Sequence, residues 1–442
     1  MSNISRKVTG VAAVALVSCA SLVGCSSETD NPSSNDATSA EEVEISYFTW
    51  SDATATAQAT ALKEAFEAEN PNITVNIDAS PGGADGDNLV RTRLSTGEMS
   101  DVFQYNAGSQ LQALNPDETL LDLSDQPWMA NVDEDFKKAV SGENGVYGAP
   151  TGTSQAGGIV YSKKVYEDLG LDIPATWDEF MANNAKIKGA GIDPVFQAYG
   201  DAWTSQLIVL GSFANVTAQD PDWAEKYTTG ERKYADDPAF EGFQSLQDLA
   251  DAGYLNENYP SANNDAAIAA LIEGTAAQYP MLTSNVVTNV RQNFPDSMDA
   301  LGLFPVPAKN ADDTRLTIWE PNSLYIPNTT EGAKLDAAKK FVEFFNSAKG
   351  CELQNQTEPA GPYAITTCSL PDDVAPIVID VQTWVENEKS GLALEFLSPV
   401  KGPNLEKILV EVGSKITSAK DASIAYDDDV RKQAQQLGLP GW

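Results

Sequence analysis

The sequence predicts an α/β protein with a mostly parallel β-sheet, because strand-like and helix-like segments alternate from residue 43 onward. Val43–Phe48 alternates apolar and polar residues with period two, and the segment from Ile73 to Ile77 repeats that pattern after an amphipathic stretch, Thr54–Glu69. Repeated strand–helix–strand units place consecutive strands parallel in one sheet, with helices on both faces. The chain of 442 residues is long enough for two domains of ordinary size.

The first helix is expected to end at Asn70, because Pro71 follows. After the second strand we expect, in order, a loop over Pro81–Gly86, a helix over Asp87–Thr96 and a strand over Asp101–Tyr105. Ligands of such sheets bind at the carboxyl ends of the strands, which here are followed by Thr49–Asp52 and Asn106–Gly108. The glycine pairs at 82–83 and 157–158 lack the spacing of a phosphate-binding fingerprint, so the sequence predicts no nucleotide site.

The first 24 residues are expected to be a cleaved export signal. Arg6 and Lys7 precede an apolar run, Val8–Val23, that is too short to span a bilayer as a permanent helix. The run ends in Leu22-Val-Gly-Cys25, which resembles the lipobox of bacterial lipoproteins, in which the cysteine becomes the lipidated N-terminus. The alternative is an ordinary signal peptide in which Cys25 has no special role.

Residues 25–41 are expected to be a flexible tether, because the stretch after Cys25 is polar and acidic and has no apolar anchor. No later apolar run reaches the length of about 18 residues that a membrane span needs. The sequence therefore predicts a protein held at the extracellular face of the cell membrane by its N-terminal lipid alone.

The composition excludes several classes of function. With 28 Lys and Arg against 64 Asp and Glu, the formal charge is −36, which repels nucleic acid and anionic lipid headgroups. The chain contains no histidine, so it lacks the commonest metal ligand, the usual general base and any Ser/His or Cys/His triad. We expect no cofactor and no metal. The run Asp427–Asp429 is read as a solvated surface.

Two cysteines remain beyond Cys25, namely Cys351 and Cys368. In an exported domain this pair favours one disulfide, which would stabilise the fold by roughly 3 kcal/mol on the chain-entropy model. The alternative is two buried free thiols. A catalytic thiolate is not expected without a histidine to lower its pKa.

The segment Tyr147–Phe180 resembles the signature of family 1 extracellular solute-binding proteins, the carbohydrate receptors of bacterial ABC importers. The residues that match the family pattern are Tyr161, Lys163, Gly170, Pro174, Thr176, Trp177 and Glu179. Ile272–Met281 resembles a second family strand, and a third match runs through Leu303–Pro307, Ser323–Pro327 and the helix Asp336–Lys349. Ser162 and Gln278 depart from the pattern, as does the stretch Leu282–Asn285, which affects the details of the sugar subsites.

This resemblance implies a two-lobed periplasmic-binding-protein-like fold of type II, with two βα sheets joined by a hinge that the chain crosses three times. We place the crossings near Pro150–Thr153, Phe304–Pro307 and Glu358–Tyr363, where Gly and Pro occur. Lobe one would comprise residues 42–152 and 306–357, and lobe two residues 153–305 and 358–442. The Cys351–Cys368 bridge would then span the third crossing.

The family also implies a ligand cleft between the lobes. Sugars present apolar faces and a rim of hydroxyl groups, which receptors meet with aromatic rings and with carboxylates, amides and backbone groups. At strand ends and in polar loops, the residues that we predict to contact the ligand are Trp50, Asp52, Asn106, Ser154, Gln155, Asp201, Trp203, Tyr279, Trp319, Glu320, Asn322 and Tyr363.

The function expected is capture of a carbohydrate, most simply an oligosaccharide, by a monomeric receptor that delivers it to a permease with its ATPase. One alternative is a surface-anchored glycoside hydrolase, since paired carboxylates in an aromatic cleft also suit that chemistry. A receptor for a peptide, a metal or an amino acid is a third possibility. Turnover of oligosaccharides would distinguish the hydrolase from a receptor, which returns its ligand intact.

Overall fold

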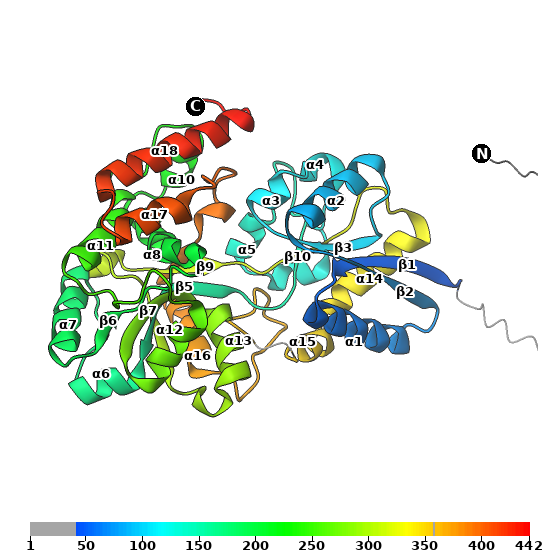
Figure 1. The fold of residues 1–442 in the computed structure, drawn as a ribbon. Helices are drawn as coiled ribbons and strands as arrows, with labels where there is room; N and C mark the ends of the chain where they lie inside the picture. The colour runs from blue at the N-terminus through cyan, green and yellow to red at the C-terminus, as the bar shows by residue number, and fades with distance from the viewer. Residues whose placement is uncertain (1–40, 357–358) are drawn as a thin grey trace, which may run out of the picture. The chain divides into compact units, whose positions relative to one another are not determined.

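Residues 41–356 and 359–442 are described in a computed structural model (Figure 1). The predicted signal peptide, Cys25 and the tether as far as residue 40 lie outside the described residues, as do Thr357 and Glu358 at a predicted boundary. The described chain contains two β-sheets, each with its own apolar core. The fold is therefore two-lobed and α/β, as the sequence predicted. None of the described helices combines the length and apolar character that crossing a bilayer requires.

The first sheet has the strand order β2-β1-β3-β10-β4, and it defines lobe one. Strand β1 pairs in parallel with β2 and β3, while β10 pairs antiparallel with β3 and β4. Both faces of β1 are covered, since Tyr47 and Phe48 are each buried. The strands are β1 Val43–Trp50, β2 Ile73–Ser80, β3 Val102–Tyr105, β4 Ala149–Pro150 and β10 Ser323–Tyr325.

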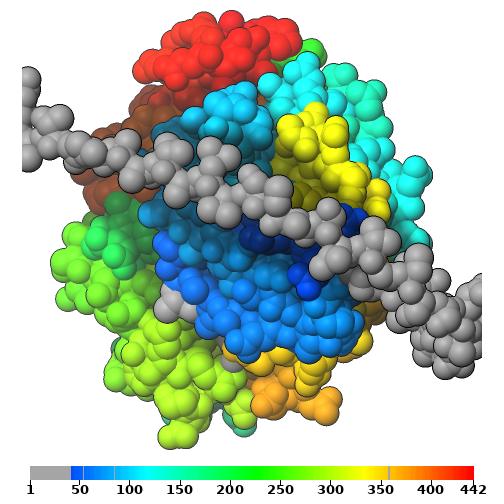
Figure 2. All heavy atoms as spheres, turned by 90° about the vertical axis from the view of Figure 1, so that its right-hand side faces the viewer, coloured from blue at the N-terminus to red at the C-terminus, as the bar shows by residue number. Residues whose placement is uncertain are grey.

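The helices of lobe one follow from local sequence signals. Asp52 caps the first helix by accepting a hydrogen bond of 2.9 Å from the Ala55 amide, and the helix packs Phe66 against the ring of Phe341, with ring centroids 5.1 Å apart. Figure 2 shows the molecule from the side on which lobe one lies. Its helical elements are α1 Ala53–Glu69, α2 Gly83–Thr96, α3 Ser109–Gln112, α4 Pro116–Thr119, η1 Pro127–Asn131, α5 Glu134–Ala139, α14 Gly332–Phe345 and α15 Ala348–Gln354.

Helix α2 corrects one expectation, because it begins at Gly83 and not at Asp87. Glycines favour loops in a sequence-based assignment. Here Gly82 stands at the N-cap and the next four residues form the first helical turn, with Asp85 placed where a negative charge is favourable. The predicted loop is therefore only two residues long, Pro81 and Gly82.

The second sheet has the order β11-β9-β5-β7-β6, with β8 also paired to β5, and it defines lobe two. Strand β5 runs antiparallel to β7, β8 and β9, so this sheet is mixed and not mostly parallel. Its strands are β5 Gln155–Ser162, β6 Asp193–Val195, β7 Ala276–Leu282, β8 Leu301–Phe304, β9 Leu316–Trp319 and β11 Ser390–Leu392.

Helices surround the second sheet, and Thr176 and Glu179 form a capping box at the start of α7. The helical elements are α6 Lys163–Leu169, α7 Trp177–Gly189, η2 Ala202–Gln206, α8 Leu207–Gly211, α9 Phe213–Gln219, α10 Trp223–Thr228, α11 Phe240–Asp251, α12 Asn264–Glu273, α13 Thr283–Asn293, η3 Pro295–Ser297, η4 Ala311–Asp313, α16 Pro376–Glu386, η5 Leu394–Phe396, α17 Leu405–Gly413 and α18 Ala419–Gln436.

The chain passes between the two sheets at three places, and two of them differ from the sequence-based placement. The first lies between β4 and β5, at residues 151–154. The second lies at residues 320–322 and not at Phe304–Pro307, because β9 pairs with β5 and β11 in lobe two. Residues 308–319 therefore do not belong to lobe one, where we expected them. The third comes after Ile365, which packs in the core of lobe one, and before Ile377, which packs in lobe two.

The first two passages are hydrogen-bonded to each other and to the segment 360–362, which precedes the third passage, at one place. The carbonyl oxygen of Asn322 accepts hydrogen bonds from the amide and the hydroxyl of Thr151, at 2.9 and 2.8 Å. The Ser154 amide donates to the Pro362 carbonyl at 2.9 Å, and the Ala360 amide donates to the Thr153 hydroxyl at 3.0 Å. These bonds join the first two passages and the segment 360–362 into a single hinge region.

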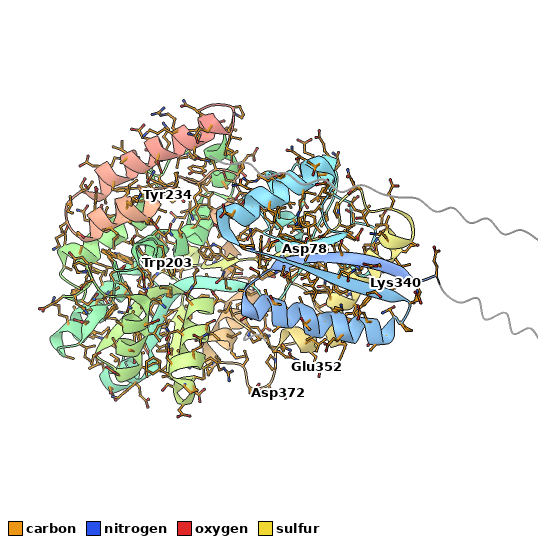
Figure 3. All side chains as sticks on the ribbon, turned by 45° about the vertical axis from the view of Figure 1, so that its right-hand side comes forward. Asp78, Trp203, Tyr234, Lys340, Glu352 and Asp372 are labelled. Carbon is orange, nitrogen blue, oxygen red and sulfur yellow. A yellow bond between two sulfur atoms is a disulfide. The ribbon has the colours of Figure 1, made fainter. Side chains whose placement is uncertain are left out.

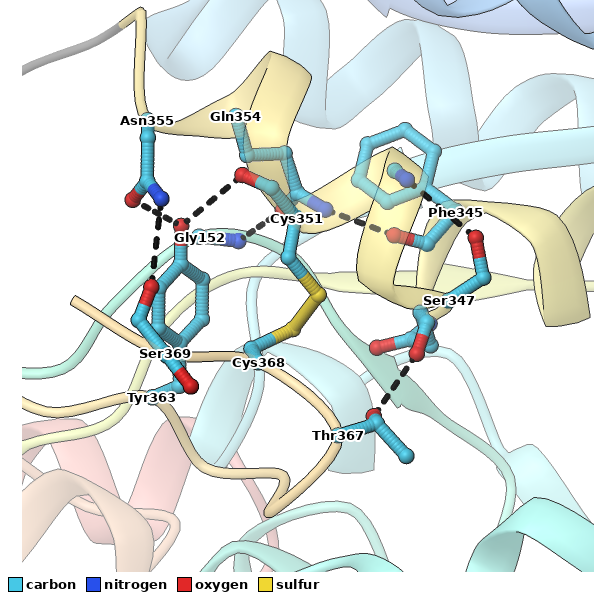
Figure 4. The surroundings of a disulfide bond; sticks show 12 residues. Gly152, Phe345, Ser347, Cys351, Gln354, Asn355, Tyr363, Thr367, Cys368 and Ser369 are labelled. Atoms are coloured by element: carbon cyan, nitrogen blue, oxygen red, sulfur yellow. Dashed lines mark hydrogen bonds between the residues drawn. A yellow bond between two sulfur atoms is a disulfide. The ribbon is translucent and has the colours of Figure 1, made fainter. Parts of the chain in front are cut away.

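Cys351 and Cys368 form a disulfide in the structure, but the bond lies within lobe one (Figure 4). Cys351 is buried in α15, and Cys368 packs against the lobe-one core. The expectation that the bridge would span the third crossing is wrong, because the chain returns from the hinge to lobe one before it enters lobe two. The disulfide instead attaches α15, beside the hinge, to the chain at Cys368, just before the chain enters lobe two.

Candidate functional site

A cavity with a volume of about 730 Å³ lies between the lobes. Lobe one contributes the turn after β3, helix α3 and one side chain of α2, and lobe two contributes strand ends, η5 and the C-terminal end of α18. The lining residues are Arg91, Asn106, Ala107, Ser109, Gln110, Gln112, Ala113, Gln155, Trp319, Glu320, Asn322, Glu395, Phe396, Pro399, Lys401, Gln433, Leu437 and Leu439. We call this cavity the interlobe cleft.

Five of the residues predicted to contact a ligand line the interlobe cleft: Asn106, Gln155, Trp319, Glu320 and Asn322. They meet there because each lies at the end of a strand or in the second passage between the sheets. Of these five, Asn106 follows the carboxyl end of a strand that we singled out for this reason, whereas Gln155 begins β5 and Asn322 precedes β10.

The Trp319 indole occupies space that a glycine on the neighbouring strand leaves open. Gly157 lies beside it in β5, and a side-chain carbon added there would come within 2.9 Å of Cη2 of the indole. Only a residue without a side chain leaves the ring its space. Gln155 pairs with Trp319 in the sheet, and its Oε1 atom accepts a hydrogen bond from the Ser284 hydroxyl.

Trp50 and Asp52 line a neighbouring hollow of about 650 Å³ that shares Asn106 with the interlobe cleft. The Trp50 ring is half-buried and leans on Phe48 and Tyr105, with ring centroids 5.5 and 6.3 Å apart. One carboxylate oxygen of Asp52 caps α1, which leaves the other for a ligand or for water. The two residues therefore border an extension of the cleft.

Ser154 and Tyr363 lie at the hinge, in a hollow of about 280 Å³ that Glu320 also lines. The Ser154 hydroxyl donates to the Pro362 carbonyl at 3.0 Å, and the Tyr363 hydroxyl donates to Oδ1 of Asn355 at 2.8 Å. The Ser154 bond therefore joins the first passage to residue 362, whereas the Tyr363 bond lies within the loop that the Cys351–Cys368 disulfide closes. Neither residue lines the interlobe cleft itself.

Asp201, Trp203 and Tyr279 do not reach the cleft, contrary to our expectation. Oδ2 of Asp201 accepts a hydrogen bond of 2.8 Å from the Asn264 amide, which ties this segment to the start of α12. Trp203 packs against the apolar core beside α12 and lies within lobe two (Figure 3). Tyr279 is fully buried on β7. These residues have polar neighbours in the sequence, but the packing of their segment beside α12 follows only from the structure.

Several cleft residues escaped the sequence analysis. Glu395 and Phe396 follow the short strand β11, so the strand-end argument used elsewhere could have found them. Gln433, Leu437 and Leu439 come from the end of an amphipathic helix, and nothing in their pattern separates them from an ordinary helix terminus.

The carboxyl group of Glu320 is the most perturbed acid of the cleft. Burial and the nearby acids Asp133 and Asp135 raise its pKa to about 8. Among the described residues, no Lys or Arg lies within ion-pair distance of it. Near neutral pH this group is therefore largely protonated and can donate a hydrogen bond as well as accept one.

Glu395 provides a second buried acid. Burial raises its pKa, while the ammonium group of Lys401, 4.0 Å away, and the Trp319 indole act in the opposite direction. The cleft thus combines aromatic rings, amides and two acids with few free charges. This combination suits a neutral ligand rich in hydroxyl groups. The described residues contain no group of three or more His, Cys, Asp or Glu side chains that could hold a metal ion.

We predict that Glu320 makes the stability of the protein depend on pH. Because its folded-state pKa is raised to about 8, the native state holds one more proton than the unfolded state between about pH 4.5 and 8. Its contribution to stability is therefore full below pH 4.5 and is lost as the pH rises through 8. Glu320→Gln should flatten the fall in melting temperature between pH 5 and 9. Identical pH profiles of parent and variant would contradict this assignment.

Comparison with known families and proteins gives consistent matches. The family model for bacterial extracellular solute-binding protein matches residues 50–350. The multiple sugar-binding protein of Streptococcus mutans serotype c is 25% identical over 292 residues, which cover 65% of this chain and 67% of that protein. The melibiose/raffinose/stachyose-binding protein MelE of Bacillus subtilis is 23% identical over 297 residues, which cover 64% of this chain and 65% of MelE. The chain thus spans about two thirds of the length of these curated relatives.

Solved structures share the fold. The putative binding protein MsmE from Bacillus subtilis, in an open conformation, superposes with a TM-score of 0.73 at 19% identity, covering 89% of this chain and 98% of MsmE. RafE in complex with raffinose gives a TM-score of 0.68 at 21% identity, covering 89% of this chain and 99% of RafE. These likenesses show the two-lobed architecture.

Proposed function

The chain belongs to the family of bacterial extracellular solute-binding proteins, and we propose that it captures a carbohydrate between its lobes for delivery to an ABC importer. The observation that supports this most is the lining of the interlobe cleft, where Trp319 and Phe396 lie among amides and acids from both lobes. Aromatic rings suit the apolar faces of sugars, and amides and acids suit their hydroxyl groups. The names of the sugar-binding relatives agree with this proposal.

We propose an oligosaccharide as the ligand. The interlobe cleft, at about 730 Å³, falls well inside the range typical of small-molecule sites, and it borders the Trp50 hollow through their shared residue Asn106. Together they offer space for more than one sugar ring. A thermal-shift screen of mono- and oligosaccharides tests this, since a ligand that binds only the folded state raises the melting temperature. No shift with any sugar would contradict the proposal.

We propose that the protein binds without catalysis. The absence of histidine removes the usual proton-transfer residue, and the family members and relatives are binding proteins. Recovery of the oligosaccharide intact after prolonged incubation would support binding alone. Hydrolysis products that appear with the parent protein, but not with Glu320→Gln or Glu395→Gln, would instead favour the glycoside hydrolase.

The membrane attachment remains a proposal that depends on Cys25. Extracellular location agrees with the family, and a lipid on Cys25 would keep the receptor near its permease. We predict that the processed protein partitions into the detergent phase, because each CH2 group of the attached lipid that is buried favours the apolar phase by about 0.8 kcal/mol. Cys25→Ser should abolish this partitioning. An unaltered processed protein that stays in the aqueous phase would contradict lipidation.

Trp50 and Trp203 provide a test, because the sequence predicted that both contact the ligand and the structure places only Trp50 next to the cleft. Trp50 borders the cleft extension, whereas Trp203 packs against the core of lobe two. Trp50→Ala should weaken sugar binding at least tenfold, since a lost aromatic contact and its buried area together exceed about 1.4 kcal/mol. Trp203→Ala should leave the affinity within about threefold of the parent, provided that circular dichroism shows a folded protein.

Isothermal titration calorimetry with the sugar from the screen measures both variants. Trp384→Ala, a second tryptophan against the lobe-two core, is the matched control for any general effect of removing an indole. A loss of affinity in Trp203→Ala, with Trp50→Ala unchanged, would place the ligand in lobe two and overturn the proposed site.

A further inference from the structure

The two lobes touch at a second point outside the hinge, between the turn after β3 and the short helix η5. A side-chain carbon added to Gly108 would lie 2.9 Å from Cδ1 of Phe396 and still closer to the carbonyl oxygen of Glu395. Gly108 also has a φ of +65°, which favours glycine. The backbone of lobe one therefore lies directly against η5 of lobe two. We call this the Gly108–Phe396 contact.

Each side of the contact is held firmly by its own lobe. The Gly108 amide donates to the carbonyl of Ala139 at 2.8 Å, and the Tyr325 hydroxyl donates to the carbonyl of Asn106 at 3.1 Å. On the other side, the Ala393 amide donates to the Ile318 carbonyl at 2.9 Å, which ties η5 to the second sheet. A displacement at the contact must therefore move one lobe relative to the other.

Phe396 is the side chain that joins the two apolar cores. It is half-buried, and it packs against the core of lobe one and against that of lobe two. Phe396 and Glu395 line the interlobe cleft, as does Ala107 next to Gly108. The contact is thus part of the cleft wall, and the hinge forms another part of it. Burial of an aromatic side chain against both cores favours the approach of the lobes without any ligand.

We propose that the Gly108–Phe396 contact is a positioning contact that holds the cleft walls at ligand-binding distance before a ligand arrives. Gly108 is required because a side chain at this position would wedge the lobes apart. The contact raises the fraction of molecules that are ready to bind, and the apparent dissociation constant varies inversely with that fraction. The inference rests on the proposed function only in taking the interlobe cleft as the ligand site.

The test measures the distance between the lobes without ligand. Spin labels on Glu98→Cys, at the exposed end of α2, and on Lys432→Cys, exposed on α18, report that distance by pulsed electron paramagnetic resonance. Gly108→Ala should lengthen the mean distance or broaden its distribution. Gly97→Ala is the matched control, because Gly97 also has a positive φ, +72°, but an added carbon there meets only Cγ2 of Thr329 at 3.7 Å. It should leave the distance unchanged.

Phe396→Ala provides a second variant that introduces no backbone strain. It should also lengthen or broaden the distance, while Phe396→Leu, which keeps an apolar side chain, should restore most of the parental distribution. With the sugar from the screen, Gly108→Ala should weaken binding at least threefold relative to Gly97→Ala. Parental distances in both Gly108→Ala and Phe396→Ala would overturn the inference. Because the distances are measured without ligand, failure to find a sugar would overturn the proposed function alone.

Discussion

The hydrogen bonds that join the first two passages of the chain between its two sheets to the segment 360–362 are the constraint on which the site depends. Thr151, Ser154 and Ala360 make these connections through the carbonyls of Asn322 and Pro362 and the hydroxyl of Thr153. Because the passages meet in one place, the strand ends of the first sheet face those of the second, and the ends of β3, β9 and β11 together form the interlobe cleft. Residues that lie far apart in the sequence become neighbours only through this region.

The disulfide supports the same region from one side. It links α15 to the outgoing chain at Cys368, and within the loop that it closes Tyr363 donates a hydrogen bond to Asn355. The side chain of Gln354 extends from α15 to the Gly152 amide in the first passage, with Oε1 at 2.6 Å from the nitrogen. The bridge therefore restrains the lobe-one side of the hinge and does not link the two lobes covalently.

Much of lobe one and five of the residues that line the cleft could be predicted from sequence, because the signals there are local. Period-two strands, the helix ending at Asn70 and the polar residues at strand ends identified β1 to β3, Asn106 and Trp319. The errors arose where tertiary context decides the outcome. Strand β9 pairs with β5, which a turn at Pro305–Pro307 cannot reveal, and Trp203 packs against the lobe-two core beside α12. The contribution of Leu437 depends on where α18 ends in space, and no local pattern encodes this.

The central claim is that a sugar binds between the lobes, and amide hydrogen exchange with and without that sugar tests it most directly. Exchange slows where a ligand excludes water or stabilises a segment against opening. The account predicts new protection in the turn and helix at 106–113, in the second passage at 320–322 and in the segment 395–401, which lie on both walls of the cleft. Protection confined to the segment 199–206 of lobe two, or to one lobe alone, would contradict it.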